Sequence, residues 1–475
     1  MITFYASRLR PLTFFFQKSK IAFLQLLILV NSSVFAANAT IKNTAVDGVP
    51  IIKSVFVEAP GTIMAGYVGC KITLTGVNFV DITAVSINKI PIPNLNDITV
   101  GQNTIVFNAI DETGFIEIRT RYNGGAIYGT KYTSLGYITS DAGNWDNDLT
   151  WFNKSVPPNT EKTAITIAHQ VKATSGVLNA GSLTINKGGE LTLPGVFNLF
   201  GDCVNKGALN NEGVFRMQEK SNYSGKPPVY SNSSVLEYVG YKGEVKDEWN
   251  GSGKVAGAGT GIPFSVILRN NADLKISNKK LSLGSGIKIG DNCSLVLDSG
   301  EMTIGGDWEK SESATFTSNA SSITFRGTDK QKVIGSNAFT NVTINGSNGV
   351  SFLGATSVSG TLNFVMGKVF LEKENLSLLP KAMITGYNNR KYIVTQSSGK
   401  LLQDAIAEGT VYPVGNKAYN PITFMATASA RYGVRVKDSI PSVSNKDKMV
   451  NRVWAISGVS GKATMKDVLS TIQQG

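Results

Sequence analysis

The chain has few of the residues on which most catalytic and metal sites depend. Its 475 residues include one histidine, His169, and three cysteines, Cys70, Cys203 and Cys293. A single imidazole excludes zinc sites built from several histidines, and no G-x-S-x-G turn accompanies it to support a Ser-His-Asp triad. We interpret His169 as an ordinary edge or turn residue. The cysteines are odd in number and far apart, which predicts buried, reduced thiols, with one disulfide as the alternative.

Charge is also scarce. Asp, Glu, Lys and Arg make up 17% of the chain, and the formal net charge is +12. Four of the basic residues, Arg8, Arg10, Lys18 and Lys20, lie in the leader described next. The rest of the chain therefore has a formal net charge of +8. No dense Lys/Arg block interleaved with aromatic residues occurs, so we expect no nucleic-acid partner. A solvated basic surface is the simplest interpretation, and mild affinity for acidic polysaccharide or an anionic surface is the alternative.

Long apolar runs are absent after the N-terminus. The leader has four basic residues, an apolar run at 21–30 and small side chains at 34–39. This order is typical of a secretory signal peptide over residues 1–36, cleaved after Ala36 or, as a second choice, Ala39. An uncleaved anchor is the alternative, although the run is short for a membrane span. We expect a linker at 37–49, no transmembrane segment after signal removal, and a secreted or cell-surface location.

What the sequence does contain is a long series of short strands separated by Gly, Asn, Ser and Asp. Leu183-Thr184-Ile185, Leu274-Lys275-Ile276 and Ile323-Thr324-Phe325 are examples of an apolar–polar–apolar pattern that runs from about 164 to 371. Alternation with period two places one side chain in a core and the next in water. Together with 49 glycines and no long amphipathic helix pattern, it predicts an all-β chain with a parallel β-helix or solenoid-like repeat stack at 139–375.

The first part of this stack, 139–163, is rich in Trp and Asp. We expect Trp145 and Trp151 to cap the open end of the stack and shield its core from water. An alternative is calcium binding, because side-chain oxygens of the kind that Ca²⁺ prefers occur close together here. The candidate ligands are Asp141, Asn144, Asp146 and Asp148.

A coarse internal repeat lies within the stack. The segment 233–240 is similar to 321–327, and 264–268 is similar to 339–345. Two related blocks, near 233–320 and 321–371, therefore predict duplication of a stacking unit.

The segment before the stack carries a recognisable motif. Residues 73–79 read Thr-Leu-Thr-Gly-Val-Asn-Phe, preceded by Gly-Tyr-Val-Gly at 66–69 and followed by Gly-Phe-Ile-Glu-Ile at 114–118. This segment resembles the IPT/TIG immunoglobulin-like domain, with Cys70 departing from the usual polar residue. The resemblance implies a β-sandwich over 50–138, in which Phe79 plugs the gap between two sheets, and a spacer or adhesive role.

The segments flanking the stack carry a second resemblance. Residues 139–171, and the phrases around Tyr412-Pro413-Val414-Gly415, Tyr419–Phe424 and Val453-Trp454, resemble parts of large secreted surface proteins of gliding, type IX-secreting bacteria. The resemblance implies a C-terminal β-sandwich module at 382–475, with Trp454 in its core. Its last strand is unclear from the sequence, so we expect a truncated or frameshifted version of a longer protein.

Two function classes follow. The preferred one is a non-enzymatic modular protein of adhesive or scaffolding use, contacting polysaccharide or other surface proteins, with no required cofactor and no catalytic residue assigned. The alternative is a carbohydrate-active β-helix enzyme, either a polysaccharide lyase or a glycoside hydrolase, because glycoside cleavage needs paired carboxylates. Its candidate acids are Glu244, Asp247, Glu248 and Asp307, with Lys246 or Arg269 as base.

Overall fold

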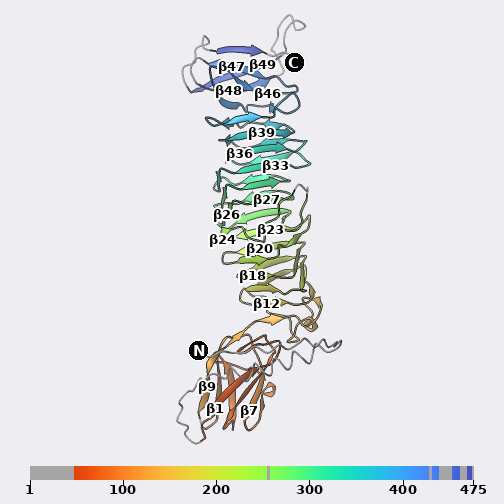
Figure 1. Ribbon diagram of the computed structural model, residues 1–475, viewed down its shortest axis with the longest axis vertical. Coiled ribbons are helices and arrows are strands. Elements are labelled where there is room, and N and C mark those ends of the chain that lie inside the picture. Colours follow the sequence, from red (N-terminus) through yellow and green to blue (C-terminus); the bar gives the residue numbers. More distant parts are fainter. Residues whose placement is uncertain are drawn as a thin grey trace, which may run out of the picture. The chain divides into compact units, whose positions relative to one another are not determined.

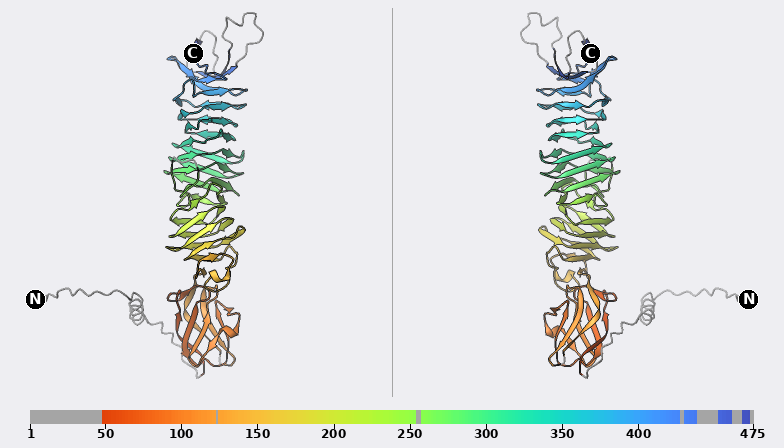
Figure 2. Two further views of the ribbon diagram at one scale, coloured as in Figure 1. Left: turned by 90° about the vertical axis from the view of Figure 1, so that its right-hand side faces the viewer. Right: turned by 90° about the vertical axis from the view of Figure 1, so that its left-hand side faces the viewer.

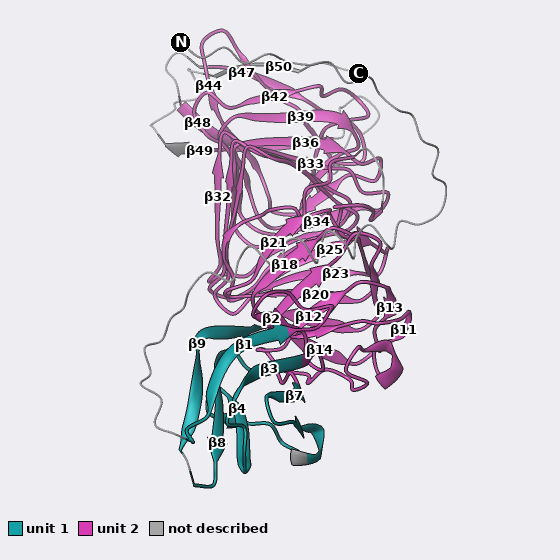
Figure 3. Ribbon diagram, turned by 60° about the horizontal axis from the view of Figure 1, so that its bottom comes forward, with its two compact units in different colours: residues 1–56, 72–107, 112–133 teal, residues 57–71, 108–111, 134–475 magenta. Residues whose placement is uncertain are grey.

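The computed structural model describes residues 48–122, 124–253, 257–426, 430–437, 452–460 and 468–472. The predicted signal peptide and nearly all of the predicted linker lie outside these residues. The chain divides into two compact units (Figure 3), unit 1 with residues 1–56, 72–107 and 112–133, and unit 2 with 57–71, 108–111 and 134–475. In the described residues we find two short 3₁₀ helices, η1 (Leu95–Asp97) and η2 (Asp148–Thr150), and no helix that could cross a membrane.

Unit 1 consists of two β-sheets (Figure 1), one in the order β1-β3-β7-β6 and one in the order β9-β8-β4-β5. Their strands are β1 (Ile51–Val57), β3 (Lys71–Val77), β4 (Ile82–Ile87), β5 (Ile90–Pro91), β6 (Thr99–Val100), β7 (Thr104–Asn108), β8 (Gly114–Thr120) and β9 (Gly125–Ser134). The short β2 (Ala65–Gly66) falls in segment 57–71 of unit 2. Alternation on β3 and β8 puts Ile72, Leu74 and Ile116 in the core. Phe79 is buried, and its ring lies where a Cβ on Gly76 would be.

Unit 2 is a parallel β-solenoid, as the sequence predicted. Strands of successive turns lie one above another along the stack (Figure 2). Consecutive strands each pair with the strand three further along, as in β12–β15, β13–β16 and β14–β17, so one turn contributes a strand to each of three sheets. Phe197 is in register with Leu178 and follows it by 19 positions. The turns are short because most of them contain three strands of two to six residues joined by tight corners.

One sheet of twelve strands runs through the whole stack, and we call it the long sheet. Its strands are β14 (Val177–Ala180), β17 (Val196–Leu199), β20 (Val214–Gln218), β23 (Val235–Val239), β25 (Ser265–Arg269), β28 (Ile287–Ile289), β31 (Trp308–Lys310), β34 (Gln331–Ile334), β37 (Val350–Phe352), β40 (Val369–Leu371), β43 (Ile393–Thr395) and β46 (Val414–Gly415).

The other two sides of the stack are formed by shorter sheets. In the N-terminal half they contain β10 (Tyr137–Ile138), β12 (Ala164–Ile167), β15 (Ser182–Ile185), β18 (Asp202–Asn205) and β21 (Asn222–Gly225), and β11 (Gly143–Asn144), β13 (Gln170–Lys172), β16 (Glu190–Leu193), β19 (Ala208–Asn211) and β22 (Val229–Tyr230). Further along they contain β24 (Lys242–Glu244), β26 (Asp273–Ser277), β29 (Ser294–Asp298) and β32 (Thr315–Asn319), and β27 (Lys280–Leu283), β30 (Glu301–Ile304), β33 (Ser322–Phe325), β36 (Asn341–Asn345), β39 (Thr361–Met366) and β42 (Met383–Thr385).

The core of the stack is a set of columns, because parallel register places each inward side chain above its counterpart one turn below. The inward column of the long sheet includes Phe197 stacked on Phe215, with ring centroids 6.0 Å apart. Further along, the Trp308 ring contacts Phe316 and Phe339 edge to face, at 4.7 and 5.6 Å. Buried aromatic pairs of this kind contribute about 0.5–1.5 kcal/mol each beyond area burial.

One turn is longer than the rest. Val266 is in register with Leu236 and follows it by 30 positions, and the sheets beside the long sheet change partners at this point. Part of the extra chain folds inward, since Glu248 and Trp249 are both fully buried. The Trp249 indole donates to the Ser282 carbonyl at 3.0 Å. The inserted loop therefore fills the gap that the change of sheets leaves in the core.

The parallel turns continue past residue 375, where the sequence analysis ended the stack. β43 pairs in parallel with β40, and β46 with β43, so the turns reach Gly415. The boundary was misplaced because Ile393, Val394 and Thr395 are all buried and show no alternation. The stack then ends in antiparallel strands, with β48 pairing β44 and β49. The strands of this region are β35 (Asn337–Phe339), β38 (Thr356–Val358), β41 (Leu376–Leu378), β44 (Leu401–Ala405), β45 (Thr410–Tyr412), β47 (Ile422–Ala426), β48 (Ala430–Lys437), β49 (Val453–Ser460) and β50 (Val468–Ile472).

The two similar blocks do not occupy equivalent places. The 233–240 segment forms β23 on the long sheet, whereas 321–327 forms β33 on a neighbouring sheet. A duplicated block would return each strand to its own sheet. The similarity instead reflects the pattern that every strand of the stack shares, which is a turn residue followed by alternating apolar side chains. The structural repeating unit is therefore a single turn.

Candidate binding groove

The polar residues of the cap region, 139–163, form hydrogen bonds within that region. Trp145 and Trp151 are buried and meet edge to face at 5.0 Å, and the Trp151 indole donates to the Trp145 carbonyl at 2.8 Å. Asp141 Oδ1 accepts the Ala142 N–H and Asp148 Oδ1 accepts the Val156 N–H, at 2.8 and 2.9 Å. The tryptophan pair thus closes this end of the core.

The geometry lends calcium binding at the cap no support. No group of three or more His, Cys, Asp or Glu side chains able to hold a metal ion occurs among the described residues. Of the four candidate ligands, Asn144 uses its backbone carbonyl to accept the Thr150 hydroxyl at 2.8 Å. The single histidine, His169, places Nδ1 3.1 Å from the hydroxyl of Thr139.

The residues proposed for catalysis are each held by a structural partner. Glu244 accepts the Ser277 hydroxyl at 2.9 Å, Asp247 accepts the Gly225 N–H at 3.0 Å, and Asp307 accepts the Lys332 N–H at 2.8 Å. Glu244 and Asp307 also belong to different sides of the stack, because Glu244 ends β24 and Asp307 directly precedes β31.

The two base candidates are equally engaged. Lys246 Nζ donates to the Asn222 side chain at 2.5 Å, and Arg269 is bound to Glu237. The structure therefore does not gather these candidates around a common point.

Glu248 is buried among tyrosines rather than exposed in a cleft. Its carboxylate accepts the Tyr238 hydroxyl at 2.8 Å and the Lys246 N–H at 3.0 Å. Burial raises the pKa of the Glu248 carboxyl above its ordinary value, although both hydrogen bonds oppose the shift. Burial likewise raises the pKa of the neighbouring Tyr241 hydroxyl to about 12. A carboxyl enclosed in this way has no access to substrate and holds the inserted loop in place.

Polar ladders, which the sequence did not predict, cover part of the outer face of the long sheet. Asn198 donates to Asn179 one turn below it, at 2.8 Å. In the turns that follow, Glu237 is bound by Arg216 below and Arg269 above. The stacking of turns brings these side chains together, because they are 19 to 32 positions apart in the sequence.

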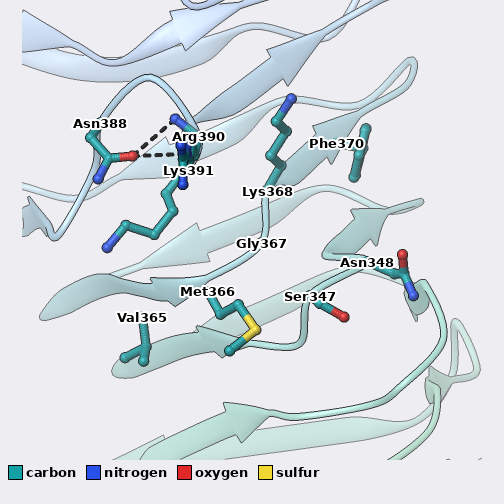
Figure 4. Close-up of a pocket in the computed structure, with 10 residues that line it drawn as sticks. All are labelled: Ser347, Asn348, Val365, Met366, Gly367, Lys368, Phe370, Asn388, Arg390 and Lys391. Atoms are coloured by element: carbon teal, nitrogen blue, oxygen red, sulfur yellow. Dashed lines mark hydrogen bonds between the residues drawn. The ribbon is translucent and has the colours of Figure 1, made fainter.

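A groove with a different character lies further along the stack (Figure 4). It has a volume of about 540 Å³ and is formed by three successive turns. Its lining comprises Ser347 and Asn348 after β36, Val365 and Met366 at the end of β39, Gly367, Lys368 and Phe370 of the next corner and β40, and Asn388, Arg390 and Lys391 of the loop before β43. We call this the cationic groove.

Two local features build the groove. Gly367 has φ 83°, and a Cβ there would lie 2.0 Å from the Gly346 carbonyl oxygen, so only glycine fits the corner from which Lys368 projects. In the loop above, Asn388 Oδ1 accepts the N–H groups of Arg390 and Lys391 at 2.9 and 3.2 Å (Figure 4). Asn388 and Lys391 also exchange backbone hydrogen bonds, which close a tight turn.

The two lysines of the groove are held by an aromatic ring and a carbonyl. Lys368 Nζ lies 4.4 Å from the centre of the Tyr392 ring and donates to its hydroxyl at 3.1 Å. Lys391 Nζ donates to the Phe364 carbonyl at 3.3 Å. Beside the groove, Lys330 Nζ lies 3.7 Å over the ring of Phe370, although Lys330 itself lines the second groove described next. Such cation–π contacts orient an ammonium without neutralising its charge.

A second groove on the long sheet provides a contrast. Its volume is about 670 Å³, and it is lined by both signs of charge: Lys288, Lys330 and Lys332 with Asp307, Glu309 and Asp329. Lys288 and Glu309 form an ion pair at 3.0 Å. This groove is internally compensated, whereas the described lining of the cationic groove contains three cations and no carboxylate.

All three cysteines are buried and free. Burial raises the pKa of the Cys203 thiol far above its ordinary value, and it also raises the pKa values of the other two. The expected reduced thiols are what the structure contains.

Comparison with known proteins gives little to add. No protein-family model and no curated protein matches the chain. A crystal structure of domains CD of another protein is matched at 24% identity over 19% of this chain, with a TM-score of 0.16. The match spans 35% of that chain's length, and a likeness this weak carries no argument about fold or function.

Proposed function

We propose that this chain is a non-enzymatic, secreted or cell-surface modular protein whose solenoid acts as a scaffold and adhesive element. The observation that carries the proposal is the use of polar side chains on the long sheet. Asn198 binds Asn179 on the turn below, and Glu237 binds Arg216 below and Arg269 above. Such ladders stabilise the stack, and the polar side chains that form them are engaged with one another rather than turned to chemistry.

The surface location rests on the N-terminal sequence, which is typical of a secretory leader. The modular character rests on resemblance. We propose that unit 1 is an IPT/TIG-like β-sandwich, on the motif at 73–79, and that the strands after Gly415 belong to a C-terminal module of the kind found in secreted proteins of type IX-secreting bacteria. Modules of these kinds separate or display binding surfaces, and they suit an adhesive protein.

An adhesion assay tests this proposal. Beads coated with the full chain should adhere to cells or to an immobilised glycan panel more strongly than beads coated with an unrelated protein of equal charge. In parallel, the chain is incubated with pectins and other polysaccharides, and reducing and unsaturated ends are measured. Turnover above that of a heat-denatured sample, or adhesion no stronger than that of the control, would show that the proposal is wrong.

A further inference from the structure

We propose that the cationic groove binds a polysaccharide that carries carboxylate or sulfate groups, an inference that rests on the proposed surface role and names its ligand class. The first argument is charge. Among the described residues, no ion pair involves the groove's three cations, Lys368, Arg390 and Lys391. Elsewhere on the stack, lysines such as Lys275, Lys280 and Lys288 do have carboxylate partners.

The second argument is the kind of donor that the groove offers. The backbone N–H groups of Arg390 and Lys391 are already taken by Asn388 Oδ1. A small anion such as free phosphate is usually held by several backbone N–H groups converging on one point. Here the donors are long cationic side chains on separate turns, which suits charges distributed along a polymer.

The third argument is spacing. Lys368 precedes β40 and the Arg390–Lys391 pair precedes β43, and these two strands are adjacent in the long sheet. Adjacent strands are about 4.7–4.9 Å apart, which is close to the length of one sugar unit in a linear chain. A polysaccharide lying along the stack would therefore meet cations on two successive turns, about one sugar apart.

The floor of the groove also suits a sugar chain. Val365 and Met366 are each 48% exposed, and Asn348 projects at the edge with its Nδ2 bound to the Thr328 carbonyl. Sugar rings have apolar C–H faces as well as hydroxyl groups, so an apolar floor bounded by amides and cations fits both. The guanidinium of Arg390 can bind a carboxylate or sulfate with two parallel hydrogen bonds.

The experiment compares two triple variants of the full chain. In the groove variant, Lys368→Gln, Arg390→Gln and Lys391→Gln are combined. In the control variant, three exposed lysines on the N-terminal half of the stack are changed instead, Lys187→Gln, Lys206→Gln and Lys226→Gln. Both lose the same net charge. Binding to polygalacturonate, dextran sulfate, neutral dextran and duplex DNA is measured by calorimetry at several salt concentrations, and circular dichroism checks that each variant is folded.

We expect the groove variant to bind polygalacturonate or dextran sulfate at least about tenfold more weakly, while the control variant stays within about twofold of the unsubstituted chain. The two anionic probes distinguish carboxylate from sulfate recognition, and neutral dextran should not bind. Affinity should also fall with salt less steeply in the groove variant, because fewer ion contacts are broken.

Three results would overturn the inference. Equal weakening of both variants would mean that net charge alone drives binding. Tighter binding of duplex DNA than of either anionic polysaccharide, lost in the groove variant, would mean that the groove takes a nucleic acid. Absence of binding to both anionic polysaccharides would mean that the groove has another use. In each case the adhesion assay still decides the proposed function independently.

Discussion

The charge ladder on the long sheet allows a sharp test of what holds the stack together. Glu237 on β23 is 2% exposed, and its carboxylate is bound by Arg216 from the turn below and by Arg269 from the turn above. Glu237→Gln keeps the shape of the side chain and one acceptor oxygen. It leaves the two guanidinium groups close together with no anion between them.

The expected cost follows from burial. A hydrogen bond to a charged group contributes about 1.5–3 kcal/mol, so two such bonds would suggest about 3–6 kcal/mol. Arg216 and Arg269 are 34% and 57% exposed, and water solvates them once the carboxylate is gone. We therefore expect Glu237→Gln to lower the free energy of unfolding by about 2–4 kcal/mol.

The same substitution at an exposed pair is the control. Glu301 lies 2.9 Å from Lys280, and the two side chains are 55% and 70% exposed. Glu301→Gln should cost about 0–1 kcal/mol. Urea denaturation followed by circular dichroism gives both values, and repeating it in 1 M salt should remove the small effect at Glu301 while leaving most of the effect at Glu237.

Equal costs for the two variants would refute this reasoning, because burial would then not distinguish the pairs. So would a cost at Glu237 that disappears in 1 M salt, since a screened interaction is a surface interaction.

Three further predictions concern the interior of the stack. Because burial raises the pKa of Glu248, the folded chain holds this proton more tightly than the unfolded chain. Its contribution to stability is therefore full below the ordinary carboxyl pKa and is lost as pH rises through the raised value. As pH rises from 4 to 8, the urea midpoint of the unsubstituted chain should therefore fall relative to the midpoint of the Glu248→Gln variant. Trp308→Phe should cost about 1–3 kcal/mol, because it leaves the buried Asn337 side-chain oxygen without the indole donor 2.8 Å away, and chemical denaturation measures it. Finally, a thiol reagent should label none of the three buried cysteines in the folded chain and all three in denaturant.

Each of these three has an outcome that contradicts it. Parallel pH profiles for the chain with and without Glu248→Gln would mean that this carboxyl does not titrate differently on folding. A Trp308→Phe variant as stable as the original would mean that water or another donor replaces the indole. Rapid labelling of Cys203 under native conditions would place this thiol outside the core. The control is the measured rate of global unfolding, which the labelling rate of a buried thiol should not exceed.

The sequence predicted the solenoid because its signal is local. Segments such as Leu274-Lys275-Ile276 alternate over three residues and end in turn residues, and they form strands as expected. Asn270 and Asn271 both have positive φ, which asparagine tolerates better than most residues. Alternation and turn chemistry therefore reveal the rungs one at a time.

The order of the rungs around the stack is not local, and it was not predicted. Every side of the stack uses the same apolar–polar–apolar pattern, so the pattern cannot say to which sheet a strand belongs. This is why 233–240 and 321–327 look alike and yet lie on different sheets. The cationic groove was missed for the same reason, since only the register of Val369 with Ile393 brings Lys368 and Arg390 to the same groove. A search for a period of about 20 residues would have been the useful signal.

The short turn has a mechanical consequence. A turn of 19 residues, such as the one from Leu178 to Phe197, occupies about 5 Å of the stack, yet the same residues span roughly 65 Å when pulled straight. Each turn contacts only its neighbours, so tension applied at the ends peels turns away in succession. The extended length of a turn that peels away is more than ten times the height that it occupied in the stack. The stack therefore extends in steps under tension, and each step dissipates energy before the next turn opens.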